Sequence, residues 1–122
     1  MVKECGYCLS IPRVPLSPNK LLGKHWSAKA KEKKAWVNEI WFACGTRHWS
    51  LALGQRMRVT ITLYNARQYD RDNAWGACKP ILDAMKALGL IVDDRAEWCD
   101  LTVKQERSTR KDKRTVIQVE PE

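Results

Sequence analysis

The sequence predicts an α+β fold in which two helices pack on one mixed β-sheet. The chain has 122 residues, which suits a single domain spanning residues 1–122, and 44% of them are hydrophobic, enough for a core. Segments with strand-like alternation and segments with helical spacing follow one another in the order β-α-β-α-β-β. This order favours one sheet covered by its helices.

The first half of the chain contains two predicted strands and one predicted helix. Residues 7–11 are expected to form a strand, followed at residues 12–18 by a proline-rich stretch that excludes regular structure. A helix is expected from an N-cap at Ser27 to a stop at Gly45. Its predicted buried stripe consists of Ala30, Val37, Ile40, Trp41 and Cys44, and Trp36 or Trp41 or both are expected in the core. Residues 57–64 alternate apolar and polar side chains, which predicts a half-buried strand.

The second half contains one predicted helix and two predicted short strands. The helix is expected over residues 80–88, because Pro80 suits its first turn and Gly89 can end it. Residues 101–104 and 115–119 are expected to be strands, joined by a charged, hairpin-like segment at residues 107–114.

Composition excludes several classes of protein. The content of aromatic and aliphatic residues argues against a disordered chain, and no apolar stretch approaches the roughly 20 residues of a membrane span. No secretory signal is recognised at the start, so the five cysteines are expected to be reduced in a cytoplasm. The net charge of +8 points to a polyanion such as nucleic acid.

The charges are segregated along the chain. Residues 20–34 carry six lysines and one acid, and residues 104–114 carry six basic residues and two acids. Between these blocks, residues 70–100 hold seven of the fourteen acidic residues. The sequence therefore separates a basic binding surface from an acidic cluster. The residues expected to contact DNA phosphates are Lys20, Lys24, Lys29, Lys31, Lys33, Lys34, Arg107, Arg110, Lys111 and Arg114.

The acidic cluster suggests metal-assisted phosphodiester chemistry. If Asp70 and Asp72 lie in extended chain, their side chains point the same way, and the following helix can bring Asp93 and Asp94 beside them. Such a group repels itself unless a cation compensates, and carboxylate oxygens suit Mg²⁺. Lys79 is placed to act on a phosphate. The same acids also fit a structural role as helix caps and turn residues.

Several of these motifs together resemble the RusA family of Holliday junction resolvases. The matching residues are Asp70, Asp72, Asn73, Lys79, Pro80, Asp83, Ala84, Gly89, Asp93 and Asp94, with a proline-rich opening at residues 11–19 and His25-Trp26 after it. The chain departs from the family at residues 74–78, where the spacer between Asn73 and Lys79 is longer than usual.

The resemblance implies a homodimeric, Mg²⁺-dependent endonuclease that cuts four-way DNA junctions by paired symmetric nicks in recombination and repair, with Mn²⁺ able to replace Mg²⁺. By position it implies metal-binding carboxylates at Asp70, Asp72 and Asp94, with Asp93 as their neighbour, and a catalytic role for these three acids and Lys79. It also implies a bacterial or phage-infected cytoplasm and an association with the nucleoid.

Two other classes of function stay open from the sequence alone. One is a junction-binding or nucleic-acid-binding module of the same fold without activity, and the other is an interaction domain whose basic face meets an acidic protein. Cys5 and Cys8 have the spacing of half a zinc site, but no second pair follows, so zinc is not expected.

Overall fold

The computed structural model describes residues 7–16, 26–44 and 54–122. Along the chain they form β1 (Tyr7–Ile11), α2 (Trp26–Cys44), β2 (Met57–Asn65), α3 (Arg71–Ala77), α4 (Lys79–Ala87), β3 (Cys99–Arg107) and β4 (Arg114–Pro121). The predicted α+β class is confirmed. Among these residues, no helix is long and apolar enough to cross a membrane.

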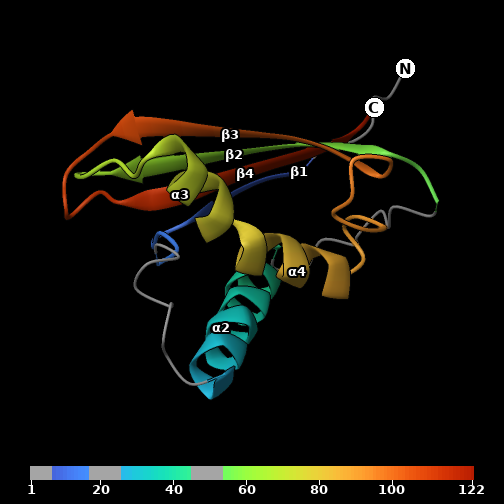
Figure 1. Cartoon of the computed structure of the whole chain (residues 1–122), viewed down its shortest axis with the longest axis horizontal. Helices are drawn as coiled ribbons and strands as arrows, with labels where there is room; N and C mark the ends of the chain where they lie inside the picture. The colour runs from blue at the N-terminus through green and yellow to red at the C-terminus, as the bar shows by residue number, and fades with distance from the viewer. Residues whose placement is uncertain (1–6, 17–25, 45–53) are drawn as a thin grey trace.

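The four strands form one mixed sheet in the order β1-β4-β2-β3. β4 runs antiparallel to both β1 and β2, whereas β3 runs parallel to β2. The parallel pair needs a crossover connection, which α3 and α4 supply. Figure 1 shows the helices gathered on one face of the sheet, and within the described residues no helix covers the other face, called here the uncovered face.

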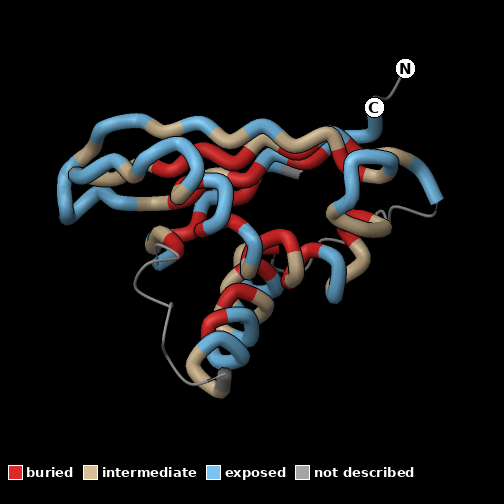
Figure 2. The backbone as a smooth tube through the Cα atoms, in the orientation of Figure 1, coloured by how far each residue is buried: buried red, intermediate tan, exposed pale blue. Residues whose placement is uncertain are grey.

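The core lies between the sheet and the helices, where Figure 2 shows the buried segments. β2 follows the predicted alternation, because Met57, Val59, Ile61 and Leu63 are all buried. Their partners in the core come from the neighbouring β4 and from the helices. The largest of these fully buried side chains are Trp36, Ile40, Ile81, Met85, Ile117 and Val119.

Helix α2 buries only part of the predicted stripe: Ile40, Cys44 and Val37 contact the core as expected, and Trp36 is the tryptophan that lies in it. Trp36, Ile40 and Cys44, spaced four residues apart, are buried, whereas Ala30 is exposed and Trp41 is 59% exposed. The helix begins at Trp26, so Ser27 lies in its first turn and the predicted N-cap is wrong. The predicted stop at Gly45 lies outside the described residues.

The chain between β2 and β3 also differs from the prediction. Asp72 belongs to the short helix α3, so the expected extended run from Asp70 to Asp72 is wrong. The next helix, α4, ends at Ala87, and the predicted terminating residue Gly89 follows two residues later with a φ of 81°. Gly89 N donates to Lys86 O at 3.1 Å and Leu90 N donates to Met85 O at 2.9 Å, which together reverse the chain after the helix.

The predicted hairpin at residues 107–114 is not formed. β3 and β4 are joined by this segment, but β2 lies between them and pairs with both. Ser108 N donates to Asn65 O at 2.9 Å, so the connection passes the carboxyl end of β2. This basic loop therefore lies at the same end of the sheet as the chain that leaves β2 for α3.

Candidate active site

Lys79, the first residue of α4, joins two acidic side chains. Its Nζ lies 3.2 Å from Asp83 Oδ1, one helical turn further on, and donates a hydrogen bond to Asp94 Oδ2. The reversal at Gly89 returns the chain along α4 and so brings Asp94 back to the start of the helix. The bond to Asp94, with a further contribution from Asp83, raises the pKa of Lys79 above its usual value. Lys79 therefore stays protonated at neutral pH.

Asp93 lies against a second group of cations. Its Oδ1 is 3.2 Å from Lys86 Nζ, and its Oδ2 accepts a hydrogen bond of 2.8 Å from Arg95 Nε. The backbone N–H of Asp94 also donates to Asp93 Oδ1, at 2.8 Å. The hydrogen bonds from Asp94, together with the two cations, hold the pKa of Asp93 well below its usual range. The charge of Asp93 is thus already compensated within the fold.

Asp70 and Asp72 stand apart from these networks. Asp70 occupies the N-cap position of α3, where its carbonyl oxygen accepts a 2.8 Å hydrogen bond from Ala74 N, while its side chain caps nothing. Asp72 lies in the first turn of the same helix, and both side chains are exposed. Within residues 7–16, 26–44 and 54–122, neither carboxylate has a hydrogen bond or an ion pair. They are therefore available to an external cation.

The backbone just before Asp70 is fixed by the side chain of Gln105 on β3. Tyr69 N donates to Gln105 Oε1 at 2.8 Å, and Gln105 Nε2 donates to Tyr69 O at 2.9 Å. The Tyr69 hydroxyl donates to Pro15 O at 2.8 Å, and burial raises the pKa of this phenol. These three bonds tie the entrance of α3 to β3 and to the segment after β1. They set the position from which Asp70 projects.

Buried Glu32 fastens that segment to α2. It lies 2.9 Å from Arg13 Nη2 and accepts a hydrogen bond of 3.2 Å from Trp36 Nε1. The Arg13 guanidinium also lies over the Trp36 ring, 4.8 Å from its centroid. Thr115 Oγ1 donates to Arg13 O at 2.7 Å, which links the same segment to β4. The segment after β1, which accepts the hydrogen bond from Tyr69, is therefore fixed to both α2 and β4.

Sequence reasoning missed Gln105 and Lys86, and it gave no role to Tyr69 or to Asp83, which it named only within the matching motifs. One signal for Gln105 was present: Leu101, Val103 and Gln105 alternate on the face of β3 that packs on the core. A polar residue in that row needs a partner, which here is the backbone of Tyr69. Asp83 and Lys86 are at ordinary helical spacing and carry no such signal.

The structure brings Lys79, Asp83 and Asp94 together, but it does not bring all the predicted metal ligands into one group. No three His, Cys, Asp or Glu side chains in the described part of the chain are close enough to hold one metal ion jointly. Mg²⁺ is commonly held by one or two carboxylates, with waters and substrate phosphates completing its shell. Asp70 and Asp72 are exposed and, within the described part, unpaired, so each offers one carboxylate of the kind that such a site uses.

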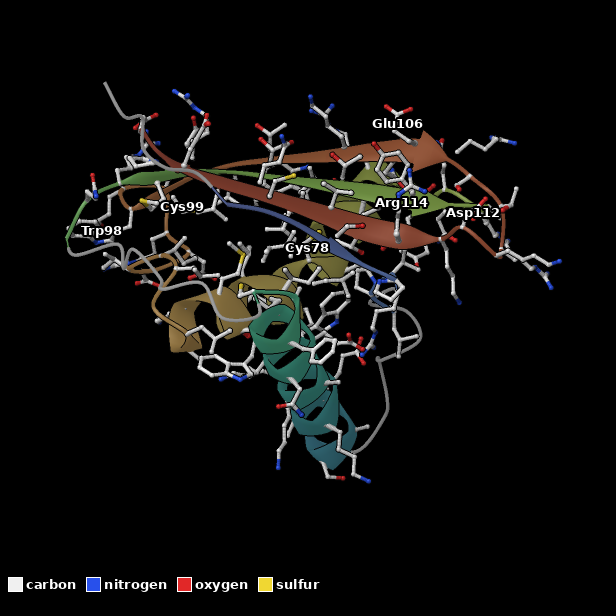
Figure 3. All side chains as sticks on the ribbon, turned by 180° about the vertical axis from the view of Figure 1, so that it is seen from behind. Cys78, Trp98, Cys99, Glu106, Asp112 and Arg114 are labelled. Atoms are coloured by element: carbon white, nitrogen blue, oxygen red, sulfur yellow. The ribbon has the colours of Figure 1, made fainter. Side chains whose placement is uncertain are left out.

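The predicted DNA-contacting residues lie on two elements. Lys29, Lys31, Lys33 and Lys34 are exposed on the first half of α2, and Arg107, Arg110 and Lys111 are exposed at the end of β3 and in the following loop. Lys20 and Lys24 lie outside the described residues. Arg114 is more constrained, because its guanidinium stacks 4.0 Å from the centroid of Tyr64 and donates to Asp112 O at 3.0 Å. Figure 3 shows Glu106, Asp112 and Arg114 together at the end of the sheet where β3 ends, whereas Trp98 and Cys99 lie at the other end.

The sequence was also compared with known proteins. No protein-family model matches the chain, and no curated protein matches it at a significant level.

Proposed function

We propose that the protein is a Mg²⁺-dependent, structure-selective endonuclease that resolves four-way DNA junctions by paired nicks in recombination and repair. One observation carries the proposal. Of the seven acidic residues between positions 70 and 100, five form ion pairs, and only Asp70 and Asp72 have no partner within the described structure. Two unpaired carboxylates in a chain of net charge +8 are the expected donor set for a cation that acts on a polyanion.

The residues of the site have distinct roles in this proposal. Asp70 and Asp72 hold the metal ion, which when bound supplies a water of lowered pKa and neutralises charge on the phosphate oxygens. Lys79 is the cation that contacts the scissile phosphate, since its side chain is 59% exposed and its raised pKa keeps it charged. Asp83 and Asp94 orient Lys79 until the substrate is present.

The basic residues provide affinity without sequence readout. The four exposed lysines on α2 and the exposed residues Arg107, Arg110 and Lys111 bind phosphates, so affinity falls steeply with salt. A four-way junction has approximate two-fold symmetry, and a symmetric homodimer presents two equal sites to opposed strands. We place this activity in the cytoplasm of a bacterium or a phage-infected host, at the nucleoid.

The test is cleavage of a labelled synthetic four-way junction beside a linear duplex of the same sequence, in Mg²⁺ and in EDTA. Asp72→Asn removes the charge of a proposed ligand with little change of shape, and Glu106→Gln is the matched control on the uncovered face of the sheet. We expect symmetric nicks in the junction only, lost in EDTA and in Asp72→Asn but kept in Glu106→Gln. Cleavage of both substrates alike, or full activity of Asp72→Asn, contradicts the proposal.

A second candidate is a junction-binding module of the same fold without nuclease activity. The observation that favours it is that Asp93 and Asp94 are engaged by Lys86, Arg95 and Lys79, and that no three acids gather in the described residues. Such a module binds the junction equally well in EDTA and in Mg²⁺ and cuts nothing under any divalent metal. The same assay, with binding measured in parallel, distinguishes the two candidates.

A further inference from the structure

Strand β3 is a long edge strand with an unused side. It has nine residues, Cys99–Arg107, and within the described part of the chain its hydrogen-bonded neighbour is β2 alone. Figure 1 shows it along the edge of the sheet. An unpaired edge of this length is a ready template for a further strand.

The printed backbone bonds show which groups face outward. Met57 N donates to Trp98 O at 3.0 Å and Ser108 N donates to Asn65 O at 2.9 Å, so residues 98 and 108 point toward β2. Backbone groups alternate sides along a strand, and the odd-numbered residues from Leu101 to Arg107 therefore direct their N–H and C=O groups to the open edge, whereas the Cys99 N–H is already bonded to Arg95 O. Leu101 and Val103, in the middle of that edge, are partly buried apolar side chains packed on the core.

We propose that β3 pairs antiparallel with β3 of a second copy of this chain, about a two-fold axis that passes beside Thr102. In this register the backbone of Leu101 forms hydrogen bonds with the backbone of Val103 in the second copy, which extends the apolar layer across the boundary between the two copies. Asp100 of each copy lies opposite Lys104 of the other, so two complementary charge pairs form on the uncovered face.

Charge disfavours two of the other symmetric registers. A two-fold axis perpendicular to the sheet keeps the helix-covered faces of both copies on the same side. Residues that face the open edge must then lie opposite residues that also face it, so the axis passes beside a residue and not between two residues. An axis beside Val103 places Asp100 opposite Glu106 twice, and an axis beside Lys104 places the two copies of that lysine against each other. Within the described residues, Lys104 has no ion pair of its own, and Asp100 is only loosely paired, 3.8 Å from Arg58.

The pairing deepens the proposed function, and this consequence rests on it. Because the axis is perpendicular to the sheet, the helices of both copies lie on the same face of one continuous eight-stranded sheet. Both pairs of carboxylates, Asp70 and Asp72, and both sets of α2 lysines then face the same side. This is the arrangement that two symmetric cuts in one junction require.

The first test is sedimentation velocity of the full chain without DNA or metal. We expect a dimer that Lys104→Glu or Asp100→Lys alone weakens by about tenfold, because each reversal puts like charges at two symmetric positions. The double variant, Asp100→Lys with Lys104→Glu, restores the opposite charges and the wild-type affinity. A monomeric wild type, or a dimer indifferent to both single reversals, overturns the proposal.

The second test fixes the register without relying on charge. With Cys5 and Cys8 replaced by Ser in all samples, Thr102→Cys is expected to form an intermolecular disulfide, because non-hydrogen-bonded cross-strand partners bring Cα atoms to about 4.5 Å. Thr60→Cys, beside it on the central strand, is the matched control and stays uncrosslinked. Equal crosslinking of both, or none in Thr102→Cys, contradicts the register. Neither test uses cleavage, so the two proposals can fail separately. If the protein dimerises as expected but cuts no junction, the nuclease proposal is wrong and the pairing stands. If the protein is an active nuclease but Lys104→Glu dimerises normally, the pairing is wrong and the nuclease proposal stands.

Discussion

The clamp between Gln105 and Tyr69 gives a prediction whose size follows from the structure. Gln105→Leu keeps the approximate volume of the side chain but removes both of its hydrogen bonds to the Tyr69 backbone, at 2.8 and 2.9 Å. A partly buried hydrogen bond contributes about 1 kcal/mol net, so the free energy of unfolding should fall by about 2 kcal/mol. For a chain of this length that corresponds to a decrease in Tm of roughly 8 °C.

The assay for this prediction is urea denaturation, combined with amide hydrogen exchange at Tyr69. Gln118→Leu is the matched control, because Gln118 is exposed on the uncovered face of the sheet and should change stability by less than about 0.5 kcal/mol. If the proposed function holds, Gln105→Leu should also lower kcat more than it raises KM, since Asp70 is displaced and the DNA-binding lysines are not. Equal stability of the two variants, with unchanged exchange at Tyr69, refutes the clamp.

Three further predictions concern charge and burial. Hydrogen bonds from Asp94, with the cations Lys86 and Arg95, depress the pKa of Asp93 in the folded state, so these interactions stabilise the fold above about pH 4 and are lost as the pH falls toward that lower pKa. Asp93→Asn should therefore flatten the fall of stability at acid pH, measured by urea denaturation, and an unchanged fall contradicts this. Glu32→Ala leaves Arg13 and Trp36 Nε1 without their acceptor and should lower the free energy of unfolding, measured by the same assay, by about 2 kcal/mol. An unchanged free energy of unfolding would show that Glu32 does not hold the segment after β1. Burial raises the pKa of Cys78 to about 12 and that of Cys99 to about 11, so at about pH 8 both should alkylate far more slowly than exposed Cys8, as followed by peptide mass spectrometry; equal rates contradict the burial.

The sequence was informative where a local pattern determines the structure. The alternation at residues 57–64 predicted β2 and its buried face, and Gly89 marked the end of α4. Both signals depend on neighbouring residues alone. The order of the elements, apart from the extra short helix α3, was sufficient for the α+β class.

Features that depend on distant contacts could not be predicted in the same way. Whether β3 and β4 form a hairpin or take β2 between them is decided by pairings far apart in the chain. The stripe of α2 that is buried depends on what packs against it, and the periodicity alone did not distinguish Trp36 from Trp41. The helix α3 is only seven residues long and contains Gly76, so its formation depends on its attachment through Tyr69.

The candidate site shows the same limit. Its acidic residues and Lys79 stand out from composition and spacing, but their partners do not. The reversal at Gly89 places Asp94 against Lys79, whereas Asp70 and Asp72 have no ion-pair partner among the described residues. This difference between the acids is a property of the folded chain.

The most direct test of the account is Mn²⁺ binding to the DNA-free protein, measured by titration calorimetry or electron paramagnetic resonance. It examines whether the unpaired carboxylates at the start of α3 are the cation site. We expect binding by the wild type and by Glu106→Gln, and its loss in Asp70→Asn and in Asp72→Asn. Unchanged Mn²⁺ affinity in both aspartate variants would place the cation elsewhere and contradict the account.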